Sequence, residues 1–359
     1  KDCSLKALME KYYTRACNFY YGSNSKKKIS KKISLPLNGS SLISFDSIEL
    51  ITRKSQKIIN IKKINKLPKN IKKKVFSDLQ NIIKKKKFHK LKFGKVPILM
   101  GVLNATPDSF SDGGKFFNDK LAYKQIKKLL DGGVKIIDLG GESTRPGAKE
   151  IKPQKEWERI KSKLNNLSKK KCIISLDTRK SFIIKKSLNY KKVSLINDVS
   201  GLTYDKDTIE ILKKSKIPFV IHHMQGTPQT MQNNPSYKNV LLDIYDFFEK
   251  KIKLLRKKNI KHNNIILDPG IGFGKNLKHN ITLISKISIF HSLGFPIMLG
   301  LSRKRYIKDI AGVNDSKERI GGTVSSCIYS SLQGIQILRV HDVNEVNQAL
   351  KVFEKLQLN

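Results

Sequence analysis

The chain has 359 residues and carries 72 Lys or Arg against 29 Asp or Glu, so its formal net charge is +43. This length allows one large domain or two smaller ones, and a hydrophobic content of 39% is compatible with a globular protein. The cysteines have neither a Cys-x-x-Cys pair nor metal-ligand spacing, which argues against a zinc site or a disulfide framework and fits a reducing cytoplasm. They are Cys3, Cys17, Cys172 and Cys327.

The charge leaves two interpretations open. A polyanion partner would explain it, but the lysines are spread along the whole chain and accompany Ile and Asn rather than clustered Arg and aromatic residues. We therefore favour a biased genome composition and predict no nucleic-acid partner; a salt-sensitive affinity for DNA would reverse this interpretation. Because no apolar stretch is long enough to span a bilayer, we also predict no membrane partner and a cytoplasmic location.

Residues 1–95 differ in character from the rest and predict a small, Lys-rich N-terminal extension that is partly flexible. Alternating apolar residues from Ile33 onwards, with a type I′ turn signal at Asn38-Gly39, predict a β-hairpin. Residues 71–87 have helical apolar spacing, and Lys84 to Lys87 is interpreted as a solvated connector. A role in binding a partner stays open.

From residue 96 short apolar strands alternate with amphipathic helices, which predicts a (β/α)8 TIM barrel over residues 96–359. Asp131-Gly132-Gly133 is expected to close the first helix, and Asp342 to cap the last. The expected strands cover residues 98–103, 134–139, 172–176, 193–197, 217–221, 265–267, 296–300 and 336–340.

Each expected strand is followed by polar residues. In this fold the carboxyl ends of the strands meet at one mouth, so a polar residue after every strand favours an enzyme. In chain order these residues are Asn104, Gly141 to Arg145, Asp177, Asn197-Asp198, His222-His223, Asp268, Ser302 to Lys304 and His341.

Two groups are expected within that mouth. Asn104, Arg339 and His341, joined by Arg145, suit a diphosphate with Mg²⁺; the alternative for His341 is a core or helix-capping role. Asp177, Asn197, Asp268 and Lys304 suit the amidine-like edge and ring nitrogens of a heterocycle, and the alternative is an internal Asp–Lys pair.

Other motifs are weaker evidence for a function. Gly270 to Lys275 lacks the spacing of a phosphate-binding loop and is interpreted as a strand-to-helix turn with Phe273 facing the pocket. His222 and His223 are adjacent, so they are expected on opposite faces of a strand and not as joint metal ligands. The polar loop after Leu103 has two carboxylates and an exposed Phe, which indicates contact with a ligand rather than an ordinary surface loop.

With these residues assembled, the chain closely resembles the dihydropteroate synthases of folate biosynthesis from about residue 96 to its end. The motifs that carry the resemblance are Leu103 to Gly114, Gly140 to Gly147, Leu267 to Gly270, Gly272 to Asn276, Ser302 to Lys304 and Arg339 to Asp342. The resemblance implies that p-aminobenzoate attacks the methylene carbon of a 7,8-dihydropterin diphosphate, which expels diphosphate and gives dihydropteroate. It also implies a Mg²⁺ cofactor and a homodimer.

The resemblance also implies roles for individual residues. Asp177, Asn197, Asp268 and Lys304 resemble pterin ligands, with Phe273 in the pocket; Thr144, Arg339 and His341 resemble contacts to the diphosphate; and Asn104 resembles the magnesium ligand. Phe110, Arg145, Pro146 and Ser302 resemble the surroundings of p-aminobenzoate, and residues 106–114 would form a lid. Catalysis is expected from Asp177, Asp268, Lys304 and Arg145.

Two residues depart from the family pattern. His222 stands where an apolar residue is frequent, and Arg305 replaces a frequent Ser. One alternative is a pterin-dependent methyltransferase, which shares the barrel but would need neither the loop after Leu103 nor a diphosphate cluster. The other is a catalytically silent barrel that binds nucleic acid or acts as a scaffold, against which the polar strand ends argue.

Overall fold

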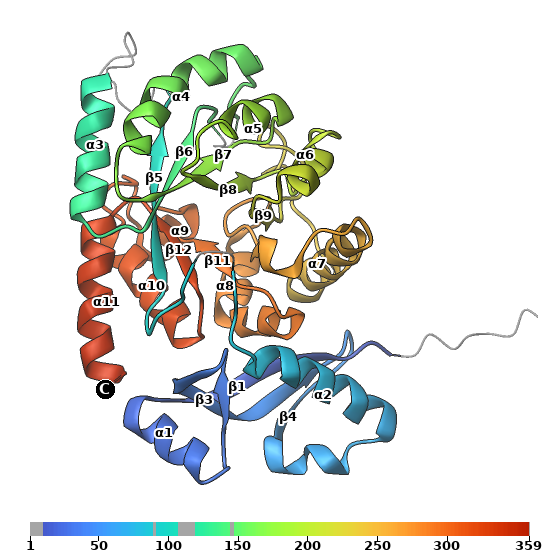
Figure 1. Cartoon of the computed structure of the whole chain (residues 1–359). Coiled ribbons are helices and arrows are strands. Elements are labelled where there is room, and N and C mark those ends of the chain that lie inside the picture. The colour runs from blue at the N-terminus through green and yellow to red at the C-terminus, as the bar shows by residue number, and fades with distance from the viewer. Residues whose placement is uncertain (1–9, 89–90, 107–118, 144–146, 359) are drawn as a thin grey trace, which may run out of the picture.

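The computed structural model describes residues 10–88, 91–106, 119–143 and 147–358. Two parts are visible in Figure 1, a small β-sheet with its helices in blue and a larger α/β part above it. Phe110, Thr144, Arg145 and Pro146, and most of the expected lid, lie outside the described residues.

The larger part is a barrel of parallel strands, as the sequence predicted. Its sheet has the order β10-β9-β8-β7-β6-β5-β12-β11. A bridge between Leu267 and Ile297, with a hydrogen bond of 2.9 Å from the Leu267 N–H to the Pro296 carbonyl, joins β10 to the β11 side. The strands are β5 (Ile98–Asn104), β6 (Ile136–Gly140), β7 (Ile173–Asp177), β8 (Val193–Asp198), β9 (Phe219–His222), β10 (Ile265–Asp268), β11 (Met298–Gly300) and β12 (Ile337–Val340).

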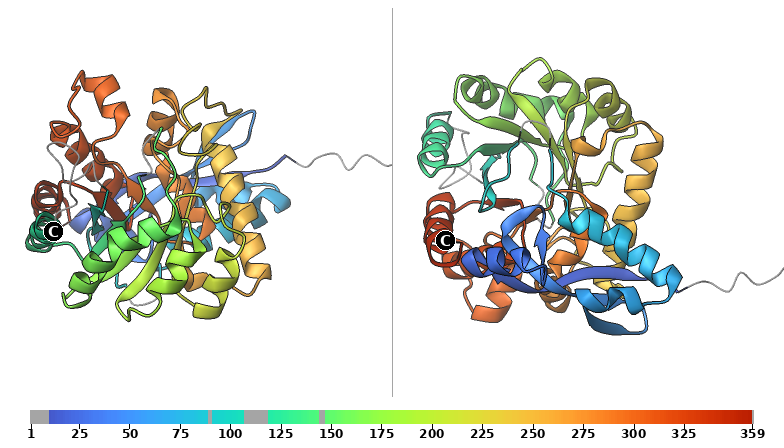
Figure 2. Two further views of the ribbon diagram at one scale, coloured as in Figure 1. Left: turned by 90° about the horizontal axis from the view of Figure 1, so that it is seen from above. Right: turned by 60° about the horizontal axis from the view of Figure 1, so that its bottom comes forward.

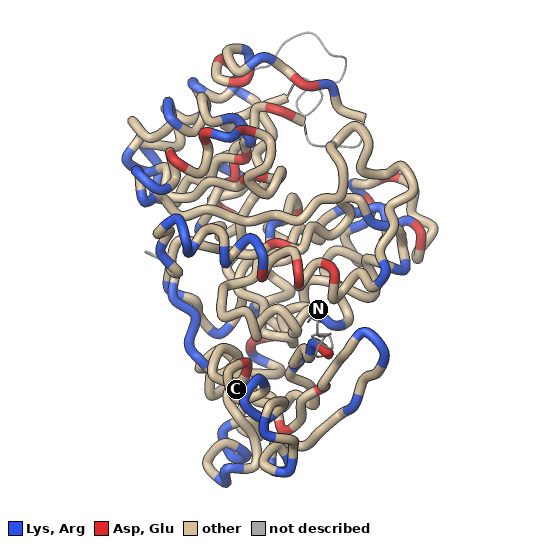
Figure 3. The backbone as a smooth tube through the Cα atoms, turned by 90° about the vertical axis from the view of Figure 1, so that its right-hand side faces the viewer, with Lys and Arg blue, Asp and Glu red and all other residues tan. Residues whose placement is uncertain are grey.

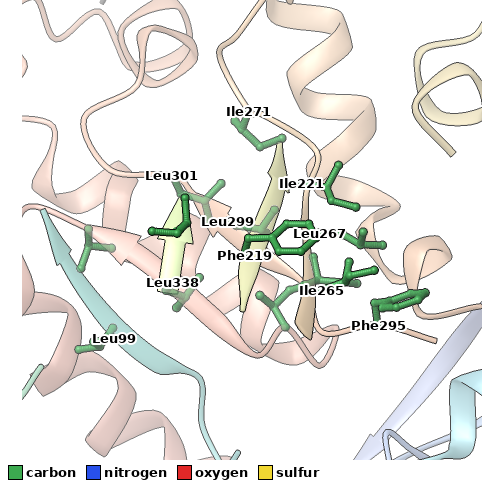
Figure 4. Packing of buried hydrophobic residues seen from close by; sticks show 14 of the residues in the cluster. Leu99, Phe219, Ile221, Ile265, Leu267, Ile271, Phe295, Leu299, Leu301 and Leu338 are labelled. Carbon is green, nitrogen blue, oxygen red and sulfur yellow. The ribbon is translucent and has the colours of Figure 1, made fainter. Parts of the chain in front are cut away.

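Helices cover the outside of this sheet (Figures 1 and 2). Strand residues that point away from the barrel axis, such as Leu99, Phe219 and Leu267, are buried in the core that these helices enclose (Figure 4). The helices are α3 (Asp119–Asp131), α4 (Pro153–Ser168), α5 (Ser181–Ser187), α6 (Thr208–Ser215), α7 (Val240–Lys257), α8 (Leu277–Ser285), α9 (Arg305–Ala311), α10 (Ile320–Leu332) and α11 (Val343–Gln357). Short 3-10 helices η3 (His262–Asn264) and η4 (Ile287–Leu293) lie between them.

Of the two helix boundaries predicted from sequence, one is confirmed and one needs correction. Helix α3 ends at Asp131, and Gly133 follows with a φ of +90°, which favours glycine. Asp342 does precede α11, but its side chain makes no capping hydrogen bond. Its carboxylate instead pairs with the Arg303 guanidinium, because two N–H donors of a cation compete better for it than the helix N–H groups do.

The extension is larger than the predicted hairpin. The hairpin itself is confirmed, and Asn38 and Gly39 have φ of 52° and 72°, as a type I′ turn requires. Long β3 also pairs antiparallel with β1 and β4, two strands that local sequence pattern did not reveal. The elements are β1 (Tyr13–Tyr21), α1 (Gly22–Ser30), β2 (Leu35–Leu37), β3 (Ser40–Ile51), β4 (Gln56–Asn60), η1 (Ile61–Lys66) and α2 (Lys69–Ile83).

The described part of the extension packs closely against the barrel. The rings of Tyr13 and Tyr245 meet edge to face with centroids 5.1 Å apart, and Lys11 Nζ lies 2.6 Å from Asp246 Oδ1 on α7. Phe353 and Leu358, at the C-terminal end of the chain, complete the hydrophobic cluster of the extension. The two parts therefore share a core.

The connector after α2 corrects one expectation. Lys86 is not solvated: its Nζ donates to the Asn81 carbonyl at the end of α2 and, at 3.3 Å, to the His291 carbonyl in η4. Burial lowers the pKa of Lys86 to about 7. One lysine of this charged segment is therefore buried and caps two helices. The sequence did not distinguish Lys86 from the solvated lysines on either side of it.

Charge is distributed over both parts of the molecule. Lys and Arg mark segments of the extension and of the barrel alike in Figure 3. Among the described residues, no helix combines the length and apolar character needed to cross a bilayer.

Candidate active site

The strand register places one polar layer at the mouth of the barrel. The inner cluster of the barrel contains Ile136, Leu195, Val220, Ile266 and Ile337. Side chains two residues apart on a strand share a face, so the residues that follow these at that spacing also point inwards. They are Asp138, Asn197, His222, Asp268 and Arg339. An apolar floor therefore supports a polar layer built from five strands.

Several residues predicted from sequence line one cleft in this layer. The cleft is bordered by Asn197, Val199, His222, Asp268, Ile271, Phe273, Gly300, Lys304 and Arg339. Lys304 Nζ lies 4.3 Å from the centroid of the Phe273 ring, within the range of a cation–π contact. The turn after Asp268 passes close to β9: a Cβ on Gly270 would lie 1.9 Å from the His223 carbonyl oxygen, so only glycine fits there.

Arg339 joins two carboxylates beneath the cleft. Its Nε donates to Asp138 Oδ2 at 2.6 Å and its Nη2 to Asp177 Oδ2 at 2.7 Å. Asn197 Nδ2 also donates to Asp138 Oδ2 at 2.9 Å. The residues expected to bind the diphosphate and those expected to bind the heterocycle are therefore not separate sets, because Arg339 of the first set contacts Asp177 of the second. The internal pair of Asp177 is with an arginine, whereas a lysine was the alternative considered.

Three buried oxygens in this cluster have no hydrogen-bond partner among the described residues: Asp138 Oδ1, Asp177 Oδ1 and Asn197 Oδ1. Unsatisfied buried acceptors are costly, so these oxygens on three adjacent strands are places for N–H donors, and Asn197 is the one of the three residues that borders the cleft. Such donors are the chemistry of an amino-substituted heterocycle.

Burial shifts the ionisation of the charged groups towards their neutral forms. It raises the pKa values of Asp177 and Asp268 and lowers the pKa of Lys304. Lys275, which donates to the Phe273 carbonyl at 2.8 Å behind the cleft, has a pKa lowered to about 7 by burial. Perturbed groups gathered in one cleft are typical of a functional site.

Beside the cleft, Ser302 and His341 lie together. The Nδ1 atom of His341 is 3.1 Å from Ser302 Oγ, and Ser302 Oγ donates to Asp342 at 3.3 Å. Burial, with Arg339 nearby, lowers the pKa of His341 to about 3. Its imidazole is therefore neutral near pH 7. Asn104 ends β5 half-buried, beside Gly140 in the register.

A buried ionic brace stands behind the mouth, which we define as Glu142, Glu156, Arg179 and Lys180. Lys180 Nζ lies 2.9 Å from Glu142 Oε1 and 2.7 Å from Glu156 Oε2, and Arg179 Nε lies 2.9 Å from Glu142 Oε2. Glu142 also accepts from the Ile151 N–H at 3.1 Å, and Lys180 donates to the Ile151 carbonyl at 2.7 Å. The brace thus ties together the two ends of segment 142–151.

Sequence reasoning missed Asp138 and the brace. A signal for Asp138 was present, since it is the one carboxylate inside the apolar run Ile136 to Leu139, and a buried carboxylate needs a partner. For the brace no signal existed, because its members lie on different elements and have ordinary spacing in the chain.

Comparison with known proteins identifies relatives of this architecture. A family model described as pterin binding enzyme matches residues 100–341. The dihydropteroate synthase of Synechocystis is 39% identical over 265 residues, which cover 74% of this chain and 91% of that protein. The dihydropteroate synthase of Neisseria meningitidis serogroup B is 40% identical over 268 residues, covering 73% and 94% of the two chains.

Solved structures similar to this chain are also dihydropteroate synthases. The crystal structure of the Yersinia pestis dihydropteroate synthase with a sulfonamide drug has a TM-score of 0.70 and 37% identity, covering 75% of this chain and 98% of that one. The Xanthomonas albilineans dihydropteroate synthase with 4-aminobenzoic acid has a TM-score of 0.68 and 31% identity, covering 73% and 93%. The family match begins after the N-terminal extension.

Proposed function

This chain belongs to the family of pterin-binding enzymes, and we propose how its residues divide the work of a dihydropteroate synthase. It is a transferase that condenses (7,8-dihydropterin-6-yl)methyl diphosphate with 4-aminobenzoate, giving 7,8-dihydropteroate and diphosphate in folate biosynthesis. The observation that carries this function is the polar layer over the barrel floor, where Asn197, Asp268, Lys304 and Arg339 line one cleft.

In the proposed site the pterin ring occupies that cleft. Asp268 accepts from the amidine-like edge of the ring, Asn197 and Lys304 meet its other heteroatoms, and Phe273 covers its face. The orphan oxygen of Asp177 lies in the same buried cluster. As the diphosphate leaves, positive charge spreads into the ring, and the carboxylates of Asp177 and Asp268 stabilise it.

In this proposal Thr144, Arg339 and His341 hold the leaving diphosphate, and Arg339 reaches it from below the cleft, where it also contacts Asp138 and Asp177. Mg²⁺ fits this place because it is usually bound by one or two protein oxygens together with substrate phosphates. The amide oxygen of Asn104, at the end of β5, is the ligand this chain offers. When bound, the ion would neutralise charge on the leaving group.

The attacking amine enters from the opposite side of the methylene carbon. Phe110, Arg145, Pro146 and Ser302 enclose the aminobenzoate in this proposal, and residues 106–114 form the lid. The C–O bond to diphosphate breaks first, the amine then forms the new C–N bond with the cationic carbon, and the amine nitrogen finally loses a proton. A closed lid would keep water from capturing the cationic carbon.

A pterin-dependent methyltransferase was the nearest alternative. The relatives reported above are dihydropteroate synthases, and the chain contains the residues for a diphosphate leaving group, which a methyltransferase does not need. The synthase is therefore the function we assign.

We further propose the organisation of the whole protein. Residues 1–95 form the extension, residues 96–359 form the synthase domain, and the protein works in the cytoplasm as a homodimer. An apolar face of α10 and α11 supports the dimer, because Val352 and Leu356, which are 53% and 80% exposed, lie on one surface with Val324 and Ile328. A second copy of this chain is the partner that would cover it.

The direct test is synthesis of dihydropteroate by the purified full chain with Mg²⁺, dihydropterin diphosphate and 4-aminobenzoate, measured by release of diphosphate. We expect Lys304→Met to weaken pterin binding by at least tenfold, since a charged hydrogen bond is lost, while the melting temperature changes little. Lys308→Met on the exposed side of α9 is the matched control and should keep wild-type binding. Folded wild-type protein without product would refute the function.

A further inference from the structure

His222 lies beside Asp268 in the polar layer. The two are partners in the parallel register of β9 and β10, and each is the second residue after an inner apolar residue, Val220 or Ile266. Neighbouring strands are about 4.8 Å apart. Both residues also border the cleft, so the imidazole and the carboxylate are available side by side to a ligand bound there.

The hydrogen bonding of His222 fixes its tautomer. The Nδ1 atom lies 3.0 Å from the Val199 carbonyl oxygen, and because a carbonyl only accepts, Nδ1 carries the proton. Burial, reinforced by Lys275 and Lys304, lowers the pKa of His222 well below its ordinary value, so the ring stays neutral. The Nε2 atom therefore keeps a lone pair.

Other contacts hold the ring in place. The Phe273 ring meets it edge to face, with centroids 4.6 Å apart, and a Cβ on Gly270 would lie 3.0 Å from its Cε1. His222 is only 3% exposed. A buried acceptor on a fixed ring is a suitable element for ligand selection, because a ligand without a matching donor leaves it unpaired.

We propose that His222 is a specificity-determining residue whose Nε2 accepts a hydrogen bond from the 2-amino group of the pterin. The inference rests on the proposed function, which supplies that ring. The amidine-like edge has three N–H bonds, one on the ring nitrogen and two on the amino nitrogen. The carboxylate of Asp268 accepts the ring N–H and one amino N–H. The second amino N–H is then available to donate to His222 Nε2.

The test compares two probes by isothermal titration calorimetry: 6-hydroxymethyl-7,8-dihydropterin and its analogue without the 2-amino group. The wild-type protein should prefer the parent. We expect His222→Leu to lose about tenfold in affinity for the parent, as for one neutral hydrogen bond, and to bind the deamino probe nearly as before. His222→Gln, whose amide oxygen also accepts, should restore most of the preference.

His223→Leu is the matched control. Its side chain is not among those that border the cleft; its Nδ1 lies 3.1 Å from Lys275 Nζ and its ring packs on Phe247, with centroids 4.9 Å apart, so its replacement should leave the ratio of the two affinities unchanged. His222→Met provides a second apolar variant if His222→Leu melts too early. Equal losses for both probes, or an undiminished preference in the apolar variants, would overturn the inference. Wild-type protein that binds neither probe would instead overturn the proposed function.

Discussion

Asp268 and Lys304 face one cleft with opposite charges, and burial moves their pKa values towards each other. The pKa of Asp268 is raised above the usual carboxyl range, and the pKa of Lys304 is lowered below the usual amine range. Desolvation disfavours the charged form in both cases. The cleft therefore holds its full donor and acceptor set over a narrower pH range than exposed side chains would.

This predicts a bell-shaped pH dependence of pterin affinity. The carboxylate of Asp268 must be ionised to accept two N–H bonds, so affinity falls as the pH drops through its raised pKa. The amine of Lys304 must be protonated to act as a charged donor, so affinity falls as the pH rises through its lowered pKa. Titration calorimetry from pH 5 to 9 should show both limbs in the wild type and only the acidic limb in Lys304→Met. An alkaline limb that persists in the variant would contradict the assignment.

At the scale of elements, the ionic brace links α4, the ends of β6 and β7, and segment 142–151. Lys180 is only 2% exposed and contacts two carboxylates and a carbonyl. Burying charges is costly, and removal of one partner leaves the others uncompensated. Two members of the brace, Arg179 and Lys180, follow Asp177 with only Thr178 between them, so the brace also holds the end of the strand that carries this side chain.

We expect Lys180→Met to lower the free energy of unfolding by about 3–5 kcal/mol, because Glu142 and Glu156 lose their shared cation. Urea denaturation would measure this, with Lys185→Met on the exposed side of α5 as the control. A loss below about 1 kcal/mol, the range of exposed ion pairs, would show that the brace is not a buried unit.

At the scale of the whole molecule, apolar surface remains on α10 and α11 outside the shared core of extension and barrel. The surface contains Val324 and Ile328 of α10 and Val352 and Leu356 of α11. Contiguous exposed apolar residues indicate an interface, and a two-fold dimer would bury the same patch on both copies.

Leu356→Lys should convert the proposed dimer to a monomer, because it places a charge within this patch. Light scattering after gel filtration would measure the mass. Leu254→Lys on α7, where the leucine is 44% exposed, is the control and should leave the mass unchanged. A wild-type monomer at micromolar concentration would disprove the dimer, and a dimer that survives Leu356→Lys would place its interface elsewhere.

The sequence by itself determined the barrel, because buried parallel strands are continuous apolar runs and each is followed by polar residues. It also determined that Asn197, Asp268 and Lys304 would meet, since strand ends in this fold converge. The local sequence pattern was sufficient to predict an element whose conformation depends on its own residues, such as the Asn38-Gly39 turn.

Only the tertiary structure decided which of these groups pair. Arg339 contacts Asp138 and Asp177 across the barrel. Lys180 contacts two glutamates from different elements. Lys86, within a run of lysines, is buried and caps two helices. Strand β1 likewise exists through its pairing with β3. Such contacts join residues far apart in sequence, and their energies depend on burial and orientation, which one residue and its neighbours in the chain do not specify.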